Sequence, residues 1–435
     1  MNATLLLVVL VVFSFAISRL LSRFASKYLV VSGVEYLLLG IILGPVIPPT
    51  VLSADTLVKF APLINLLLGL VGFLLGLRAR SSLRPANVAF GGILSSLALI
   101  ALVAAPTLAF LEALVPDHDA LRYQLFALPI GESLLYVEAS SEHIWLALTI
   151  GCAAAVSSPV LIAQTARLHR ARGPTLDVLH GYGMVGQLVA LVVFGVTLTW
   201  ARAAESADFF RIPIGLWAVV TIAAGILCGL LFNLFIGRER DEMRIYVAAL
   251  GSVTFAAGIG AALEVSPLVV NLVAGLVVSF TSRHASRLET VLMPLRHPIL
   301  VLLRLFAGAL WTPVRGVAWL LAPLYVAVRV VARWQTTWMS AWMVRKVPRI
   351  PRLGLGLVGQ GGLAVAIAVS FAQRFPAQAP IALTTILGGI LLSDVWSHRA
   401  VRRILADAGE LDAPEEPSAG SRSRTRAHRH LGGGG

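Results

Sequence analysis

Two hydrophobic segments of this 435-residue chain are interrupted near their middles by residues that break helices. The first interruption is Ser157-Ser158-Pro159, within residues 143–166, and the second is Gly359-Gln360-Gly361-Gly362, within residues 353–371. Lipid offers no hydrogen-bond partners, so irregular backbone at membrane depth is tolerated only where it faces protein or a water-filled cavity. Broken helices in matching places of two halves typically form a transporter's binding site. The pair therefore predicts a transport site.

Composition predicts an all-α polytopic membrane protein, because 57% of the residues are hydrophobic and only 13% are charged. The apolar runs predict about thirteen transmembrane helices. Residues 1–399 then form one transmembrane domain, and residues 400–435 form a disordered basic cytoplasmic tail. The predicted spans are residues 2–20, 33–48, 57–77, 87–111, 143–166, 175–200, 213–236, 244–262, 266–280, 297–311, 317–339, 353–371 and 380–396.

Charges in the connections predict the orientation of the chain. Basic residues follow every second span, as in Arg78-Ala79-Arg80 and in the connection holding Arg167, Arg170 and Arg172. The longest intervening connection is acidic and contains Glu112, Asp117, Asp119, Glu132, Glu138 and Glu142. The positive-inside rule then places the N-terminus outside and the C-terminus in the cytoplasm. The two broken spans run in opposite directions, which predicts an inverted repeat.

Several function classes have no support in the sequence. The net charge of +13 follows from the basic connections and the tail, so it does not indicate nucleic-acid binding. Both cysteines, Cys152 and Cys228, fall inside spans and predict neither a disulfide framework nor a metal site. No nucleophile with a base, metal-ligand cluster or phosphate loop is recognisable, so we expect neither an enzyme nor a cofactor.

Four segments resemble the monovalent cation:proton antiporters, especially the Kef-type branch. They are Gly33 to Pro45 (GVEYLLLGIILGP), Leu74 to Leu77 (LLGL), Ala155 to Pro159 (AVSSP) and Gly356 to Gly362 (GLVGQGG). The resemblance implies an inverted-repeat fold in which a six-helix core domain moves against a dimerisation domain. It further implies a homodimer in a bacterial inner membrane, exchanging Na⁺ or K⁺ for protons where the two broken crossover helices meet.

The chain departs from that family where the ion site is expected. Gln187-Leu188 stands where the family has Gln-Asp, and Gln360-Gly361-Gly362-Leu363 stands where it has Gln-Gly-Gly-Glu. Proton-coupled exchange needs a group that is charged when it holds the cation and neutral after it takes a proton. Leucine provides neither state. The other carboxylates near spans are expected at span ends, namely Glu35, Asp177, Glu264 and Asp394.

Four polar residues remain as candidates around that position. His180 and Gln187, seven residues apart, share a helix face; His180 is either a substitute proton carrier or a hydrogen-bond partner of a neighbouring helix. Arg329 matches the family's base before the second crossover, and carbonyls at the ends of the broken helices are its expected partners. Arg304 is a second intramembrane base, explained either by pairing with Glu264 or another acid at a span end, or by anion binding.

Two hypotheses follow from these residues. In the first, the chain is a cation:proton antiporter with an unusual site built from Ser157, Ser158, Gln187 and Gln360, with His180 for protons. In the second, it is a transport-inactive homologue that acts as a scaffold, sensor or subunit for an unidentified protein partner. In that case Leu188, Leu363 and Arg329 lock the site, while the breaks at Pro159, Gly361 and Gly362 are kept as architecture.

Overall fold

The computed structural model describes residues 33–48, 51–114, 122–130, 133–205, 214–236, 241–282, 285–314, 316–343 and 352–411. The regular secondary structure within these ranges is helical, except for one antiparallel hairpin of β1 (Arg122–Ile130) and β2 (Ser133–Ser140). The hairpin lies in the connection that the sequence analysis described only as acidic. The prediction of an all-helical fold class is otherwise confirmed.

The described helices match twelve of the thirteen predicted spans, and the first span, residues 2–20, lies outside the described residues. Eight of these segments are long and apolar enough to cross a membrane, and four shorter apolar helices accompany them. In chain order the helices are α2 (Val34–Leu43), α3 (Ala54–Lys59), α4 (Ala61–Leu77), α5 (Ala79–Ser82), α6 (Ala86–Leu114), α7 (Ser141–Ala155), α8 (Pro159–Leu168), α9 (Pro174–Glu205), α10 (Ile214–Ile236), α11 (Glu242–Ala262), α12 (Pro267–Thr281), α13 (Ala285–Leu292), η1 (Met293–Leu295), α14 (Arg296–Leu310), η2 (Gly316–Leu320), α15 (Leu321–Met343), η3 (Leu353–Leu357), α16 (Gly362–Arg374) and α17 (Ala379–Asp407).

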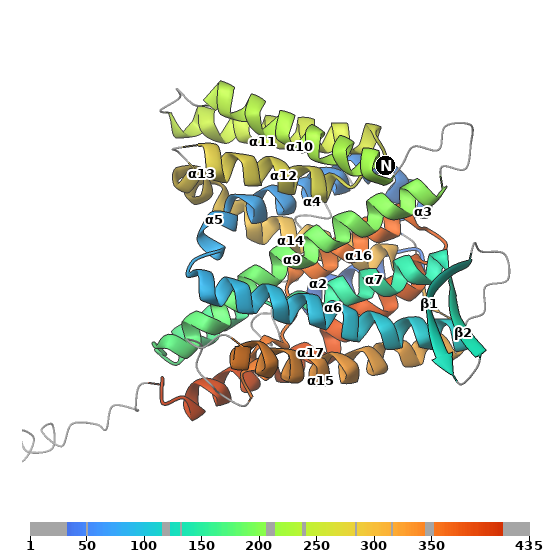
Figure 1. Ribbon diagram of the computed structural model, residues 1–435. Helices are drawn as coiled ribbons and strands as arrows, with labels where there is room; N and C mark the ends of the chain where they lie inside the picture. The colour runs from blue at the N-terminus through green and yellow to red at the C-terminus, as the bar shows by residue number, and fades with distance from the viewer. Residues whose placement is uncertain are drawn as a thin grey trace, which may run out of the picture.

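The long helices lie side by side and form two groups (Figure 1). Helices α4, α10, α11 and α12 pack together in one group, and α6, α7, α9, α15, α16 and α17 make up the other. The pair α2 and α14 contacts both groups through α4 and α16. The two groups therefore share an interface that involves α4, α9, α14 and α16.

Small residues allow the closest helix pairs to approach backbone to backbone. A Cβ atom on Gly72 would lie 2.0 Å from the Leu268 carbonyl oxygen, so α4 and α12 touch there without room for a side chain. A Cβ on Gly40 of α2 would lie 2.1 Å from the Leu305 carbonyl oxygen of α14. Small residues at helix crossings are the usual means of tight packing in membranes, where lipid supplies no hydrophobic drive for association.

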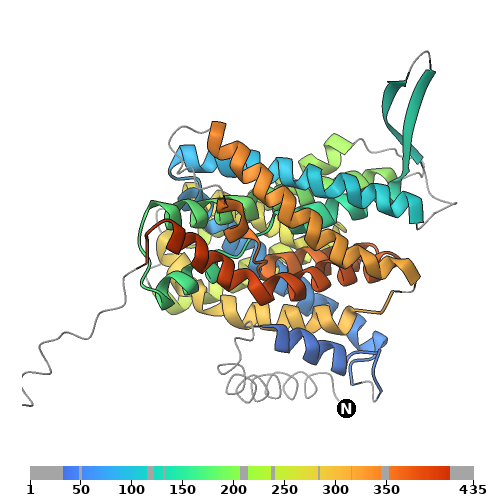
Figure 2. The ribbon, with the colours of Figure 1, turned by 90° about the horizontal axis from the view of Figure 1, so that it is seen from below.

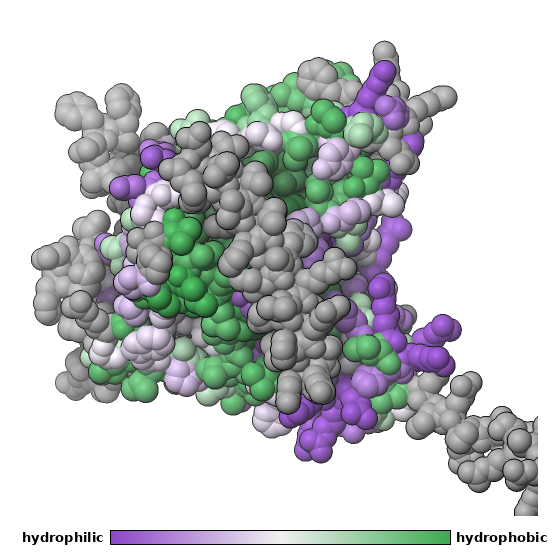
Figure 3. Space-filling model, turned by 180° about the vertical axis from the view of Figure 1, so that it is seen from behind, coloured by the Kyte–Doolittle hydropathy of each residue, from purple (hydrophilic) through white to green (hydrophobic). Residues whose placement is uncertain are grey.

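The outer surface carries the apolar side chains expected of a membrane protein. On α10 and α11, Val219, Leu234 and Val247 are 59%, 75% and 60% exposed. Figure 3 shows hydrophobic patches on one face, with many of the strongly hydrophilic residues along its right-hand side. Exposed apolar surface of this extent is costly in water and favourable in lipid. The chain is therefore a polytopic membrane protein.

Helix α17 continues past residue 400, where the sequence analysis placed the start of a disordered tail. Val401, Ile404 and Leu405 are buried in a cluster with Leu353 and Leu357 of η3, which explains why the helix extends to Asp407. Residues 412–435 lie outside the described residues. In Figure 2 the end of α17 lies on the side of the bundle opposite the hairpin.

Glu410, just beyond α17, ties this end of the molecule to α9. Its carboxylate accepts hydrogen bonds from the backbone N–H groups of Thr175 at 2.6 Å and Leu176 at 3.0 Å. These amides belong to the first turn of α9, where donors lack partners within the helix and negative charge meets the positive end of the dipole. The contact therefore fixes the start of the helix that carries Gln187.

Candidate functional site

The two broken helices cross at their interruptions. Helix α7 ends at Ala155 and α8 begins at Pro159, while η3 ends at Leu357 and α16 begins at Gly362. The backbone N–H of Ser158 donates to the Gly359 carbonyl oxygen at 2.9 Å. This bond joins the first crossover, residues 156–158, to the second crossover, residues 358–361.

Local sequence explains why the first helix restarts where it does. The Ser158 side chain accepts from the Leu161 N–H at 3.3 Å, and Pro159 occupies the first turn of α8. Serine is a favoured N-cap, and proline fits the first helical position because its missing N–H would have no partner there. The second crossover has no such cap, since Gly361 offers no side-chain acceptor at the start of α16.

Two fully buried arginines of α15 hold the free carbonyls of these breaks. Arg329 donates from Nε to the Ala154 oxygen at 2.9 Å, from Nη2 to the Val156 oxygen at 2.9 Å, and from Nη1 to the Val358 oxygen. Arg333 donates to the oxygens of Ala154 and Ala155. The carbonyls at a helix C-terminus have no partner within the helix and carry partial negative charge. Carbonyl groups thus surround the guanidinium of Arg329, as expected from the sequence, and Arg333 adds a second base.

The side-chain amides of Gln187 and Gln360 also bind the crossover. Gln187 of α9 donates from Nε2 to the Ser157 carbonyl oxygen at 2.8 Å. Gln360 donates from Nε2 to the Ala153 oxygen at 3.0 Å and to the Tyr325 hydroxyl. The buried Oε1 of Gln360 and Oγ of Ser157 have no hydrogen-bond partner. The break therefore presents oxygen atoms that the protein itself does not use.

Leu188 and Leu363 are both buried, 8% and 5% exposed. Leu363 and Gln187 line a cavity of about 40 Å³, together with Val71 and Arg296 among others. This small cavity brings together two positions that are far apart in the sequence and that the sequence analysis named as candidates for the ion site. Both leucines are apolar, so neither places a carboxylate there.

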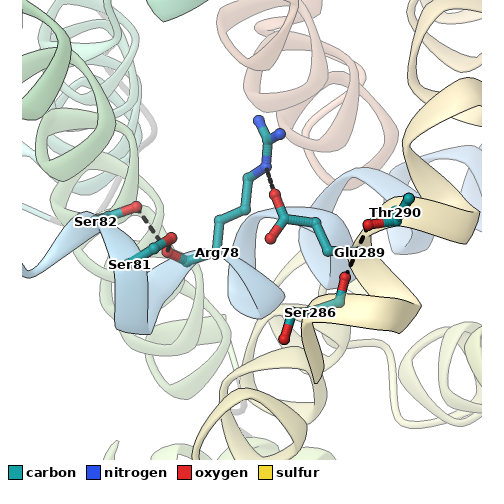
Figure 4. A network of polar contacts seen from close by, with 6 residues as sticks. All are labelled: Arg78, Ser81, Ser82, Ser286, Glu289 and Thr290. Carbon is teal, nitrogen blue, oxygen red and sulfur yellow. Dashed lines mark hydrogen bonds and ion pairs between the residues drawn. The ribbon is translucent and has the colours of Figure 1, made fainter. Parts of the chain in front are cut away.

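Arg78 lies at the edge of the small cavity and forms an ion pair with Glu289 of α13. Its Nε lies 2.7 Å from Glu289 Oε1, and its carbonyl accepts from the hydroxyls of Ser81 and Ser82 (Figure 4). The bridge joins the end of α4 to α13 at the end of the bundle where α17 finishes (Figure 1).

A larger cavity of about 580 Å³ lies along the same helices toward the other end of the bundle. It is lined by α4 at Asn65, α9 at Thr199, α14 at Leu310 and α16 at Ser370, whereas the small cavity touches these helices at Val71, Gln187, Leu300 and Leu363. Six to twelve residues of helix rise about 9 to 18 Å, so two to three turns separate the cavities. Residues between them, among them Leu68, Leu191 and Ile367, are buried and apolar.

An acidic residue joins two bases at the wall of the large cavity. Glu264 Oε2 lies 2.6 Å from Arg202 Nη1 and 3.9 Å from Arg374 Nη1. The hydrogen bond from Arg202, strengthened by the charges of both arginines, holds the pKa of the Glu264 carboxyl below its usual value. Glu264 is therefore the partner of Arg202, and Arg304 must be balanced by other acids.

His180 does not line the small cavity, although the charges of Arg78 and Arg296, which do line it, act on the imidazole. It is exposed and lines a separate cavity of about 560 Å³ with Arg167, Arg170 and Arg172. Seven residues of helix place it about 10 Å along the axis from Gln187. The histidine and the two crossovers thus do not form one cluster.

Asp394 corrects an expectation of the sequence analysis, which placed it near a span end. It lies in the middle of α17 and is only 4% exposed, because the helix runs on to Asp407. The positive charges of Arg304 and Arg329 act on its carboxylate, and the backbone of Gln360 lies near it. Arg304 in turn faces both Asp394 and Glu35.

The comparisons with known proteins support the fold. No protein-family profile matches the chain, and no curated protein sequence matches it. Its structure is similar to that of the sodium proton antiporter MjNhaP1 from Methanocaldococcus jannaschii, with a TM-score of 0.63 and 15% sequence identity, over 93% of this chain and 100% of that one. The chain therefore has the fold of a sodium/proton antiporter.

Proposed function

We propose that this protein is a secondary transporter of the monovalent cation:proton antiporter type. The observation that carries the proposal is the pair of cavities on α4, α9, α14 and α16. They approach one interface from opposite ends and are separated by buried apolar residues. Alternating access needs this arrangement, in which one bundle rocks against another around a site near the crossed broken helices.

The proposed transport site is the crossover between the two cavities. The first helix break contributes Ser157, Ser158 and Pro159, and the second contributes Gln360, Gly361 and Gly362. Ser157 Oγ and Gln360 Oε1 are buried oxygens without hydrogen-bond partners, and oxygen is the donor type that alkali cations prefer. The substrates would be Na⁺ or K⁺ and protons, in keeping with the Kef-type resemblance of the four sequence segments.

The membrane context of the proposal follows from the charges. With the arginine-rich end of the bundle in the cytoplasm, the small cavity opens inward and the large cavity opens outward. The N-terminus is then outside and the C-terminus inside, in a bacterial inner membrane. A homodimer is the assembly that the resemblance implies, and opposite directions of α7–α8 and η3–α16 make an inverted repeat of the two halves.

A second candidate function is a transport-inactive homologue that serves as a scaffold, sensor or partner-binding subunit. The observation that favours it is the small cavity, which is lined by Leu363 and by no carboxylate among the described residues, while the neighbouring position 188 is a buried leucine. The side-chain amide of Gln187 is already hydrogen-bonded, because its Nε2 donates to the Ser157 carbonyl.

Proton movement in proteoliposomes separates these two functions. The purified protein is challenged with a Na⁺ or K⁺ gradient beside the double variant Leu188→Asp, Leu363→Glu, with empty liposomes as the baseline. Exchange by the natural chain supports the antiporter. A silent natural chain with an active double variant supports the inactive homologue. If both are silent, neither an active nor a switched-off ion site lies at this position.

A further inference from the structure

Asp394 is a buried carboxylate in the membrane-spanning part of α17, near the charges of Arg304 and Arg329. It lies on α17 with 4% of its surface exposed, and its Oδ1 atom has no hydrogen-bond partner. A buried charge is costly unless it is paired and hydrogen-bonded. Among the buried side-chain atoms without a hydrogen-bond partner in the described part of the chain, Asp394 Oδ1 is the one carboxylate oxygen; Glu410, by contrast, caps α9 with both of its oxygens. The open oxygen of Asp394 is therefore unusual within the described part of the chain.

The surrounding charges permit Asp394 to exist in two states. Arg304 of α14 and Arg329 of α15 face the carboxylate, and Glu35 of α2 acts on Arg304 from the other side. Arg333 stands one turn beyond Arg329 and faces the α7 carbonyls. His398, one turn along α17, contacts the Thr165 hydroxyl at 3.1 Å. Opposite charges favour the ionised carboxylate, whereas burial favours the neutral acid.

Asp394 is also connected to the second crossover. The backbone of Gln360 lies near its carboxylate, and Arg329, whose charge acts on that carboxylate, donates to the carbonyls of Val156 and Val358. A proton added to Oδ1 removes a negative charge from beside Arg329 and weakens the acceptor opposite the Gln360 amide. The protonation state would therefore act directly on the backbone where the two broken helices meet.

We propose that Asp394 is the proton-binding site of this chain. It supplies the carboxylate that positions 188 and 363 lack. The step is a simple transfer, in which Oδ1 accepts a proton from water on one side of the membrane and returns it to water on the other. This inference rests on the proposed transport function. It names the residue that would couple that function to protons.

The experiment compares Asp394→Asn with Asp407→Asn, the same change on an exposed carboxylate of the same helix. In proteoliposomes with a Na⁺ or K⁺ gradient, proton movement should fall to the level of empty liposomes in Asp394→Asn and remain unchanged in Asp407→Asn. Asp394→Glu should retain exchange with a displaced pH profile, because a carboxylate is kept in an altered position. Exchange by Asp394→Asn at the natural rate and pH profile would overturn the inference while leaving the transporter proposal intact.

A second measurement decides the inference if the natural chain transports nothing, in which case the antiporter proposal fails separately. Infrared difference spectra of the purified protein are recorded between alkaline and acidic pH. A carbonyl band of a protonated carboxylic acid should form in the natural chain and in Asp407→Asn and be missing in Asp394→Asn. A spectrum identical in all three proteins would show that Asp394 takes up no proton.

Discussion

The two crossovers differ in the groups that bind their backbone. At the first, between α7 and α8, the carbonyls of Ala154, Ala155 and Val156 bind arginine, and Ser158 caps the restarting helix. At the second, between η3 and α16, Arg329 binds only the Val358 carbonyl, and the helix starts without a side-chain cap. The first break is thus held by bases that keep their charge, whereas the second lies beside the carboxylate of Asp394. The difference points to the second crossover as the one that can respond to a proton.

The largest expected effect comes from Arg329→Met, because this side chain binds both crossovers. Loss of the guanidinium removes three hydrogen bonds and leaves the buried carbonyls of Val156 and Val358 without their side-chain donor, which should lower the free energy of unfolding by about 3 kcal/mol or more. Unfolding in a detergent titration measures the change, and Arg402→Met, at an exposed position on α17, is the control. Equal stability of the two variants would show that the breaks do not depend on this base.

Arg333→Met tests the first crossover alone. Arg333 binds the oxygens of Ala154 and Ala155 and none at the second break, so we expect a smaller loss of about 1 to 3 kcal/mol. The same titration measures it. A loss as large as that of Arg329→Met would contradict the view that Arg329 contributes more because it binds both breaks.

Ser158→Ala removes the cap of the first crossover and should cost about 1 kcal/mol of stability. Ser158→Thr retains a hydroxyl acceptor and serves as the matched control. If alanine and threonine are equally stable, the bond to the Leu161 N–H contributes nothing to the restart of α8.

Gly361→Ser should have the smallest effect and the opposite sign. Gly361 has an extended backbone, and a Cβ there would lie 3.5 Å from its nearest neighbour, an ordinary contact. A serine cap should therefore stabilise the protein by a few tenths of a kcal/mol, while Gly361→Ala, which offers no acceptor, should not. A destabilised serine variant would indicate that the second crossover needs its uncapped form for packing.

The sequence was sufficient to identify the membrane class, the two breaks and the carbonyl partners of Arg329. These features depend on local composition or on one residue in an apolar run. Arg333 was overlooked, although its spacing of four residues from Arg329 places both on one helix face. The four-residue spacing could therefore have identified Arg333 as a second base facing the breaks.

Asp394 was misjudged for a physical reason. Hydropathy ends the last span near residue 396, but the amphipathic continuation of α17 buries Val401 and Leu405 and moves the helix end to Asp407. Contacts between distant segments, such as Glu410 with the first turn of α9, leave no local pattern. They depend on the tertiary arrangement and could not be predicted from one sequence.

The most direct test of the transport account uses two positions on α4. Asn65 lines the large cavity and Val71 lines the small one. Single cysteines at these positions, with Cys152 and Cys228 changed to alanine, are labelled with a membrane-impermeant maleimide from each side of the membrane while pH and Na⁺ or K⁺ are varied. The account predicts reciprocal labelling, in which conditions that expose position 71 on one side protect position 65 on the other. Labelling that does not change with any condition would contradict alternating access.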